Sequence, residues 1–252
     1  MGEWEMFYVT GDIHGGIDIA KLSGKNFPEG KALSRKDYII ICGDFGLPFL
    51  PTDTLPMEKQ ISTPWRRSGR KEYRYWISWL SERPYTVLWV DGNHDNHCYW
   101  NGQQSVEWNG GRAHIHPDAE NVIHLMRGEY YEIDGNTFWA MGGAASHDRF
   151  CRKEGENWWP EEIPDDSQMQ HGTDTLAAHG WKTDYILTHT LPQKLVHPLG
   201  LRLDPPEPTR EYFDYIHENT DFRCWFCGHY HIDLDCPEYR MRILYRDLAG
   251  PF

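Results

Sequence analysis

The sequence lacks any long apolar segment. Its apolar stretches, such as 38–42 and 86–90, are far shorter than the roughly 20 residues that a membrane-spanning helix needs. Residues 1–5 also lack the basic region and following apolar stretch that mark a signal peptide. We therefore expect a cytoplasmic protein that neither crosses a membrane nor is exported.

Positive charge is scarce as well. The chain has 25 Lys and Arg against 38 Asp and Glu, so its formal net charge is −13. An acidic surface repels a phosphate backbone, which makes broad nucleic-acid binding unlikely as an activity. A local basic patch or bound metal ions could still override this repulsion near a binding site.

Paired cysteine motifs are almost absent. Among six cysteines, only Cys224 and Cys227 form a Cys-x-x-Cys pair, and Cys236 alone does not complete a four-cysteine zinc site. Cys227 ends an apolar run directly before Gly228, where a small buried residue fits. We therefore expect free thiols and no structural zinc.

What the chain does have is a set of polar stretches that each follow an apolar run. Such runs predict buried strands. In open α/β sheets, ligands bind beyond the carboxyl ends of the strands, so we expect these polar side chains to meet at one place. Their nitrogen and oxygen atoms are typical donors of a transition-metal site. The stretches are Gly11-Asp12-Ile13-His14-Gly15, Gly43-Asp44, Gly92-Asn93-His94-Asp95, His189 and Gly228-His229-Tyr230-His231.

This series of motifs resembles the calcineurin-like metallophosphoesterase superfamily, in particular its bacterial and phage members. The motifs run from residue 11 to residue 231, so the resemblance spans most of the chain. It implies an α/β fold, a four-layer αββα sandwich of two mixed β-sheets flanked by helices. We expect a single domain over 1–252, in which segments 47–69 and 143–180 form caps or inserts near the site.

The resemblance also implies a site with two metal ions, where metal-bound hydroxide attacks the phosphorus of a phosphomonoester or phosphodiester. Asp44 would bridge the two ions. The other ligands would be Asp12, His14 and His231 for the first ion, and Asn93, His189 and His229 for the second. Such ligands suit Mn, Fe, Zn, Ni and Co alike.

Two further residues take catalytic positions by the same resemblance. His94 would protonate the leaving oxygen or hold the phosphoryl group, and Asp95 would orient His94 by a hydrogen bond. Three residues of the second segment, His147, Arg149 and Arg152, are candidates for contact with the substrate.

Three alternatives stay open. A protein phosphatase of the superfamily would carry Gly-Asp-x-Val-Asp-Arg-Gly at its second motif, whereas this chain has Gly43-Asp44-Phe45-Gly46 and lacks that arginine. A nuclease fits the third motif, which ends in Asp95, but the net charge weighs against it. A non-catalytic, metal-stabilised scaffold for protein binding would be expected to lose ligands, and this chain keeps the full set.

Other patterns predict the remaining elements. Tyr73, Trp76, Ile77 and Leu80 share one face of a helix predicted over 71–82. Residues 96–120 read as an irregular surface segment that exposes three histidines, and three strands after it read as an antiparallel meander in the second sheet. The histidines are His97, His114 and His116, and the strands are 121–126, 129–133 and 137–141.

Overall fold

The computed structural model describes residues 6–54, 66–201 and 207–252, and these form two six-stranded sheets. The first sheet has the order β1 (Phe7–Gly11), β2 (Tyr38–Cys42), β3 (Thr86–Val90), β6 (Ala119–Leu125), β5 (Gly111–His116) and β4 (Val106–Trp108). The second has the order β11 (Leu234–Cys236), β12 (Met241–Ile243), β10 (Cys224–Cys227), β9 (Tyr185–Thr188), β8 (Asn136–Met141) and β7 (Glu129–Ile133). In each sheet four adjacent strands run parallel and the others antiparallel, so both sheets are mixed.

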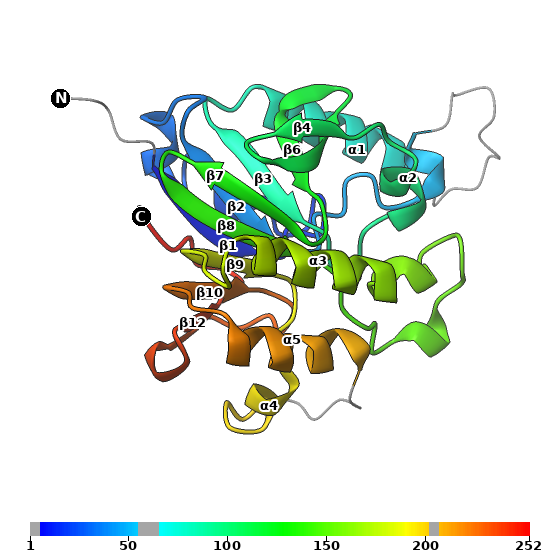
Figure 1. Ribbon diagram of the computed structural model, residues 1–252. Helices are drawn as coiled ribbons and strands as arrows, with labels where there is room; N and C mark the ends of the chain where they lie inside the picture. Colours follow the sequence, from blue (N-terminus) through cyan, green and yellow to red (C-terminus); the bar gives the residue numbers. More distant parts are fainter. Residues whose placement is uncertain (1–5, 55–65, 202–206) are drawn as a thin grey trace.

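Helices cover the outer faces of the two sheets (Figure 1). On the side of the first sheet lies α1 (Arg66–Ser81), which packs against β6, and α2 (His97–Asn101) follows β3. On the side of the second sheet lie α3 (Asp166–Ala178) and α5 (Pro208–Asn219), and the short α4 (Gln193–Val196) contacts α5. The predicted four-layer sandwich of two mixed sheets is therefore confirmed.

The alternation of side chains along the strands explains these layers. In β2, Ile39 and Ile41 pack with α1, whereas Ile40 and Cys42 point into the layer between the two sheets. Because successive side chains of a strand point to opposite faces, a run that is apolar throughout must be covered on both sides. Each sheet is therefore sandwiched between helices and the other sheet.

The helix predicted over 71–82 is confirmed, although it begins earlier, at Arg66. Tyr73, Ile77 and Leu80 are buried against the first sheet, and Trp76 packs at the edge of the same cluster. Among the described residues, no helix combines the length and the apolar character that crossing a bilayer requires.

The predicted meander is wrong in one strand. β7 and β8 pair antiparallel in the second sheet as expected, but β6 belongs to the first sheet, parallel to β3. The chain crosses from one sheet to the other at Arg127 and Gly128, and Gly128 has a φ of +74°. The sequence marks this turn but does not say that it joins two sheets.

The three histidines predicted at the surface are in fact buried, because residues 96–120 contain α2, β4 and β5. His114 Nδ1 lies 3.1 Å from His124 Nδ1, and His116 Nε2 lies 3.1 Å from the Tyr73 hydroxyl. His97 Nδ1 lies 3.8 Å from a carboxylate oxygen of Asp91. Burial lowers the pKa of His97 to about 3 and that of His114 and His116 to about 4.

Candidate active site

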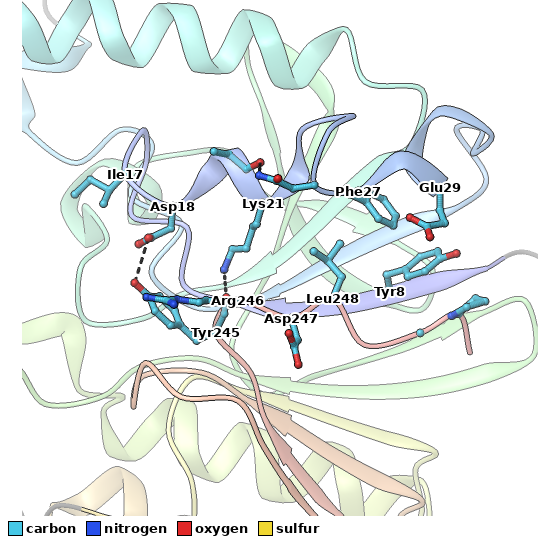
Figure 2. A pocket seen from close by; sticks show the side chains of 14 residues that line it. Tyr8, Ile17, Asp18, Lys21, Phe27, Glu29, Tyr245, Arg246, Asp247 and Leu248 are labelled. Carbon is cyan, nitrogen blue, oxygen red and sulfur yellow. Dashed lines mark hydrogen bonds between the residues drawn. The ribbon is translucent and has the colours of Figure 1, made fainter.

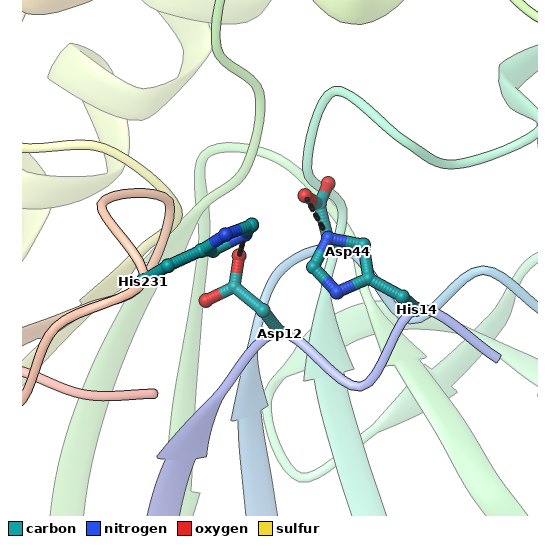
Figure 3. Close-up of side chains that lie close together, drawn as sticks. All are labelled: Asp12, His14, Asp44 and His231. Atoms are coloured by element: carbon teal, nitrogen blue, oxygen red, sulfur yellow. Dashed lines mark ion pairs between the residues drawn. The ribbon is translucent and has the colours of Figure 1, made fainter. Parts of the chain in front are cut away.

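The first group of predicted ligands gathers beyond the ends of β1, β2 and β10. One donor atom from each of four side chains lies within 4.8 Å of the others. Figure 3 shows the four side chains close together. Within this group, His14 Nε2 is 3.2 Å from Asp44 Oδ2, and His231 Nε2 is 3.6 Å from Asp12 Oδ1. The group comprises Asp12, His14, Asp44 and His231.

The tautomer of His14 follows from its second partner. Nδ1 of His14 is 2.8 Å from Asp18 Oδ2, and because a carboxylate oxygen only accepts, Nδ1 carries the proton. In the neutral ring Nε2 then has a lone pair, and this lone pair faces the carboxylate of Asp44. Two acceptors in this arrangement need a proton or a metal cation between them.

The second group lies beyond β3, β9 and β10. Asn93 Oδ1 is 3.0 Å from His189 Nε2 and 3.0 Å from His229 Nδ1, and these two nitrogens are 3.3 Å apart. His189 Nδ1 donates to the Cys42 carbonyl at 2.8 Å, so in the neutral ring the Nε2 lone pair faces the group. The same Nε2 is 3.3 Å from Asp44 Oδ1.

Asp44 therefore faces both groups, with Oδ2 toward the first and Oδ1 toward the second. Burial alone would raise its pKa, but His189, His94 and His14 hold that pKa well below its usual value. For His14 and His189, burial has the opposite effect and would lower the pKa. The carboxylates around them outweigh it and raise these pKa values to about 9 and about 10. The site strongly favours added positive charge, so its donors fit metal cations.

The backbone of the site is held in unusual conformations. Of the nine non-glycine residues with positive φ in the described ranges, five are predicted ligands, and such conformations cluster at functional sites. They are Asp12 (23°), His14 (44°), Asp44 (50°), His229 (70°) and His231 (52°).

Glycines in the motifs allow the carboxylates to approach the neighbouring loops closely. A Cβ atom at Gly92 would lie 2.2 Å from Asp44 Oδ1, and one at Gly228 would lie 2.4 Å from Asp12 Oδ2. Any larger residue would displace these ligands.

Two residues that sequence reasoning missed, Ser146 and Glu162, help to orient the Asn93 amide. The Glu162 carboxylate accepts hydrogen bonds from the Ser146 hydroxyl at 2.6 Å and from the Ser146 backbone N–H at 2.8 Å. Since the hydroxyl proton points to Glu162, Ser146 Oγ accepts from Asn93 Nδ2 at 3.2 Å. This leaves Asn93 Oδ1 facing His189 and His229. No sequence motif marks this pair.

Contacts of Tyr245 and Lys21 join the first group of ligands to the chain that follows β12. These two residues also line a cavity of about 610 Å³ (Figure 2). The Tyr245 hydroxyl donates to Asp18 Oδ1 at 3.1 Å, and its ring stacks on His231 with centroids 4.7 Å apart. Lys21 donates to the carbonyls of Gly11, Asp12 and Tyr245, which ties this segment to the loop that carries two ligands. Asp18 could have been suspected from its position four residues after His14, but Tyr245 carries no local signal.

His94 borders the first group, with its ring centroid 5.7 Å from that of His14. Its Nε2 accepts from Asn93 Nδ2 at 3.1 Å and from Arg152 Nη2 at 3.5 Å. Burial lowers the pKa of His94; the charge of Asp44 opposes this shift, and Arg152 adds to it. Nε2 is therefore an unprotonated acceptor that faces the site.

Among the described contacts, Asp95 has no hydrogen bond to His94, the residue that the resemblance expects it to orient. Its carboxylate is fully buried and accepts hydrogen bonds from the backbone N–H groups of Gly46 and Gly92, each at 2.7 Å. Asp95 thus joins the loop after β2 to the loop after β3. Burial and the nearby charge of Asp44 raise its pKa to about 7, against the effect of these hydrogen bonds.

The family model for calcineurin-like phosphoesterases matches residues 6–233 of the chain. The chain belongs to this family. A calcineurin-like phosphoesterase is a hydrolase of phosphate esters, and the clustered ligands agree with the metal dependence of the family. Among solved structures, the chain is similar to the phosphopantetheinyl hydrolase from Mycobacterium tuberculosis, with 15% identity and a TM-score of 0.42, over 97% of this chain and 89% of that one. No curated protein matches the chain.

The three substrate-contact candidates of this calcineurin-like phosphoesterase lie at different places. Arg152 reaches His94, and its guanidinium is held by the two carboxylate oxygens of Asp148 at 2.6 and 2.7 Å. His147 lies beside the second group, with its ring centroid 5.1 Å from that of His229. Arg149 instead stacks over the Trp158 ring at 4.4 Å.

Proposed function

We propose that this phosphoesterase uses two metal ions to hydrolyse a phosphomonoester or phosphodiester. The observation that carries the proposal is the position of Asp44, whose two oxygens face two separate groups of acceptor atoms. A single ion would use one such group, whereas a shared carboxylate between two groups is typical of dinuclear phosphoesterase sites.

Asp12, His14, His231 and Asp44 would hold one ion, and Asn93, His189, His229 and Asp44 the other. When bound, such ions neutralise the phosphoryl oxygens and lower the pKa of a coordinated water, so that hydroxide is available near neutral pH.

The chain's own residues supply orientation and a proton. His94 Nε2 faces the site as an acceptor, and the charge of a bound phosphate would raise its pKa, so that it can take up a proton and pass it to the leaving oxygen. Arg152 lies next to this atom and can donate to a phosphoryl oxygen.

We also propose that the chain forms one domain in which the predicted segments 47–69 and 143–180 border the site. In support, Leu47, Phe49 and Arg152 line a cavity with His94. Of the first segment, residues 55–65 lie outside the described ranges. Free thiols at all six cysteines are compatible with the reducing cytoplasm, which we propose as the compartment.

The test is hydrolysis of p-nitrophenyl phosphate and bis-p-nitrophenyl phosphate by metal-stripped protein, with Mn, Ni, Zn or Mg added back separately. We expect at least one metal to restore turnover in the wild type and none to restore it in Asp44→Ala. The ratio of the two rates separates a monoesterase from a diesterase. Turnover that is equal in Asp44→Ala and wild type would overturn the proposal.

A further inference from the structure

A cavity of about 420 Å³ opens directly beside the proposed metal site. His14, His94 and Arg152 form its border with the site. A volume of this size accommodates a ligand larger than a phosphoryl group, since small-molecule pockets start at about 300 Å³. The group that leaves with the ester oxygen would occupy this cavity, because His94 lies between the cavity and the predicted ligands.

The walls of the cavity are mainly apolar. Leu47, Phe49 and Leu50 come from the loop after β2, and Tyr73 comes from α1. Phe49 lies edge-on to His94, with ring centroids 6.5 Å apart. An aromatic or other apolar group bonded to the phosphate would therefore be placed against these side chains.

Among the charged side chains that line the cavity, the negative charges prevail. Asp148 already pairs with Arg152, the one arginine or lysine among the described lining residues. Two carboxylates, Asp53 and Glu72, line the cavity as well. The Arg152 guanidinium lies at the His94 end of the cavity, 3.5 Å from His94 Nε2. The Glu72 carboxylate instead lies over Gly16, where an added Cβ would be 2.1 Å from Glu72 Oε1.

Asp53 strengthens this acidic character from within the wall. Its side chain is only 5% exposed, and Oδ2 accepts from the backbone N–H groups of Phe49 and Leu50 at 3.2 and 2.8 Å. Its other oxygen, Oδ1, is buried and has no hydrogen-bond partner among the described residues. A cationic group in the cavity would gain from both carboxylates, and an anionic one would be repelled.

We propose that this cavity selects phosphate esters whose leaving group has an apolar ring and a cationic end, and disfavours those with an anionic end. This inference rests on the proposed function, since the cavity adjoins the phosphoryl site only if phosphate binds there. Glu72 is the residue whose charge can be changed with least disturbance, because it is exposed on α1.

The experiment compares the affinities of two non-hydrolysable probes, para-(aminomethyl)benzylphosphonate and para-carboxybenzylphosphonate, by calorimetry with the metal-loaded protein. Exposed charge pairs contribute little each, but the probes differ by a full charge reversal, so we expect the aminomethyl probe to bind roughly fivefold or more tightly. In Glu72→Gln this ratio of Kd values should fall, while Glu82→Gln, an exposed glutamate just past the end of α1, should keep the wild-type ratio.

Equal affinity of the two probes for the wild type, or a ratio that Glu72→Gln leaves unchanged, would overturn the inference. The same proteins are assayed with p-nitrophenyl phosphate. Hydrolysis without any charge preference among the probes would sink only the selectivity, whereas no hydrolysis and no phosphonate binding would remove the proposed function and the inference together.

Discussion

Replacing Ser146 with alanine should weaken one proposed metal site and spare the other. Ser146 Oγ accepts from Asn93 Nδ2 at 3.2 Å and donates to Glu162 at 2.6 Å, and it contacts no predicted ligand of the first group through its side chain among the described contacts. Without the hydroxyl, the Asn93 amide nitrogen loses one of its two acceptors and keeps only His94 Nε2, so Oδ1 is held less firmly toward His189 and His229. Only the site that uses Asn93 should respond.

The size of the effect follows from the lost hydrogen bond. Removing a hydrogen bond from a buried polar group costs about 1–3 kcal/mol, and substitutions of residues that orient metal ligands typically cost about 10–100-fold in affinity. We therefore expect roughly tenfold weaker binding of one Mn²⁺ ion in Ser146→Ala. Calorimetric titration of metal-stripped protein resolves the two binding events.

The matched control is Ser78→Ala, at an exposed position of α1, which should bind both ions as the wild type does. If Ser146→Ala binds both ions with wild-type affinity, the hydrogen bond to Ser146 does not hold the Asn93 amide in place for the metal. An equal loss at both sites would show that Ser146 supports the whole site and not the Asn93 amide.

Two further predictions follow from other parts of the structure. His94→Gln should lower kcat by roughly 10²–10⁴ without changing the number of metal ions bound, as measured by steady-state kinetics and metal analysis; unchanged kcat would remove His94 from the reaction. The buried His97, His114 and His116 have pKa values of about 3 to 4 in the folded protein, against 6.5 in the unfolded chain. The stability that these neutral histidines contribute is therefore fully present above about pH 6.5 and is lost as the pH falls toward the folded-state values. Urea unfolding of metal-free protein should show a loss of about 2 kcal/mol per histidine at about pH 5, less in His116→Gln than in the exposed control His197→Gln; an identical loss in both variants would contradict this account.

The ligands could be predicted from the sequence because each directly follows a strand. Parallel strands in one sheet end at the same edge, so a polar residue such as Asp12 or Asp44 after an apolar run is placed without knowledge of the rest of the fold. The layers were predictable for the same reason, since apolar runs such as that of β2 require cover on both faces.

The supporting contacts could not be predicted, because they join residues that are distant in the sequence and belong to no repeated pattern. Asn93 depends on Ser146 and Glu162, and His231 stacks on Tyr245, which only the tertiary structure shows. The contacts of Asp95 could not be predicted for a related reason. Its neighbour in the sequence is His94, but its carboxylate points to two backbone amides.

The buried histidines illustrate a limit of reading polarity from sequence. His114 and His116 alternate with Ile115 in β5, and a polar residue at such a position is normally assigned to the exposed face. Here Ile115 is the more exposed residue, at 39%, and the histidines are buried with His124 and Tyr73 as partners. A histidine is compatible with either face, because its ring is partly apolar and its nitrogens need only a partner.

The central claim is that Asp44 joins two metal sites, and the most direct measurement is electron paramagnetic resonance of metal-stripped protein loaded with Mn²⁺. Two ions that share a carboxylate are close enough to couple magnetically. We predict two Mn²⁺ per chain and a multiline spectrum of a coupled pair, which Asp44→Ala should lose. A single bound ion, or the simple six-line spectrum of isolated Mn²⁺ at full loading, would contradict the account.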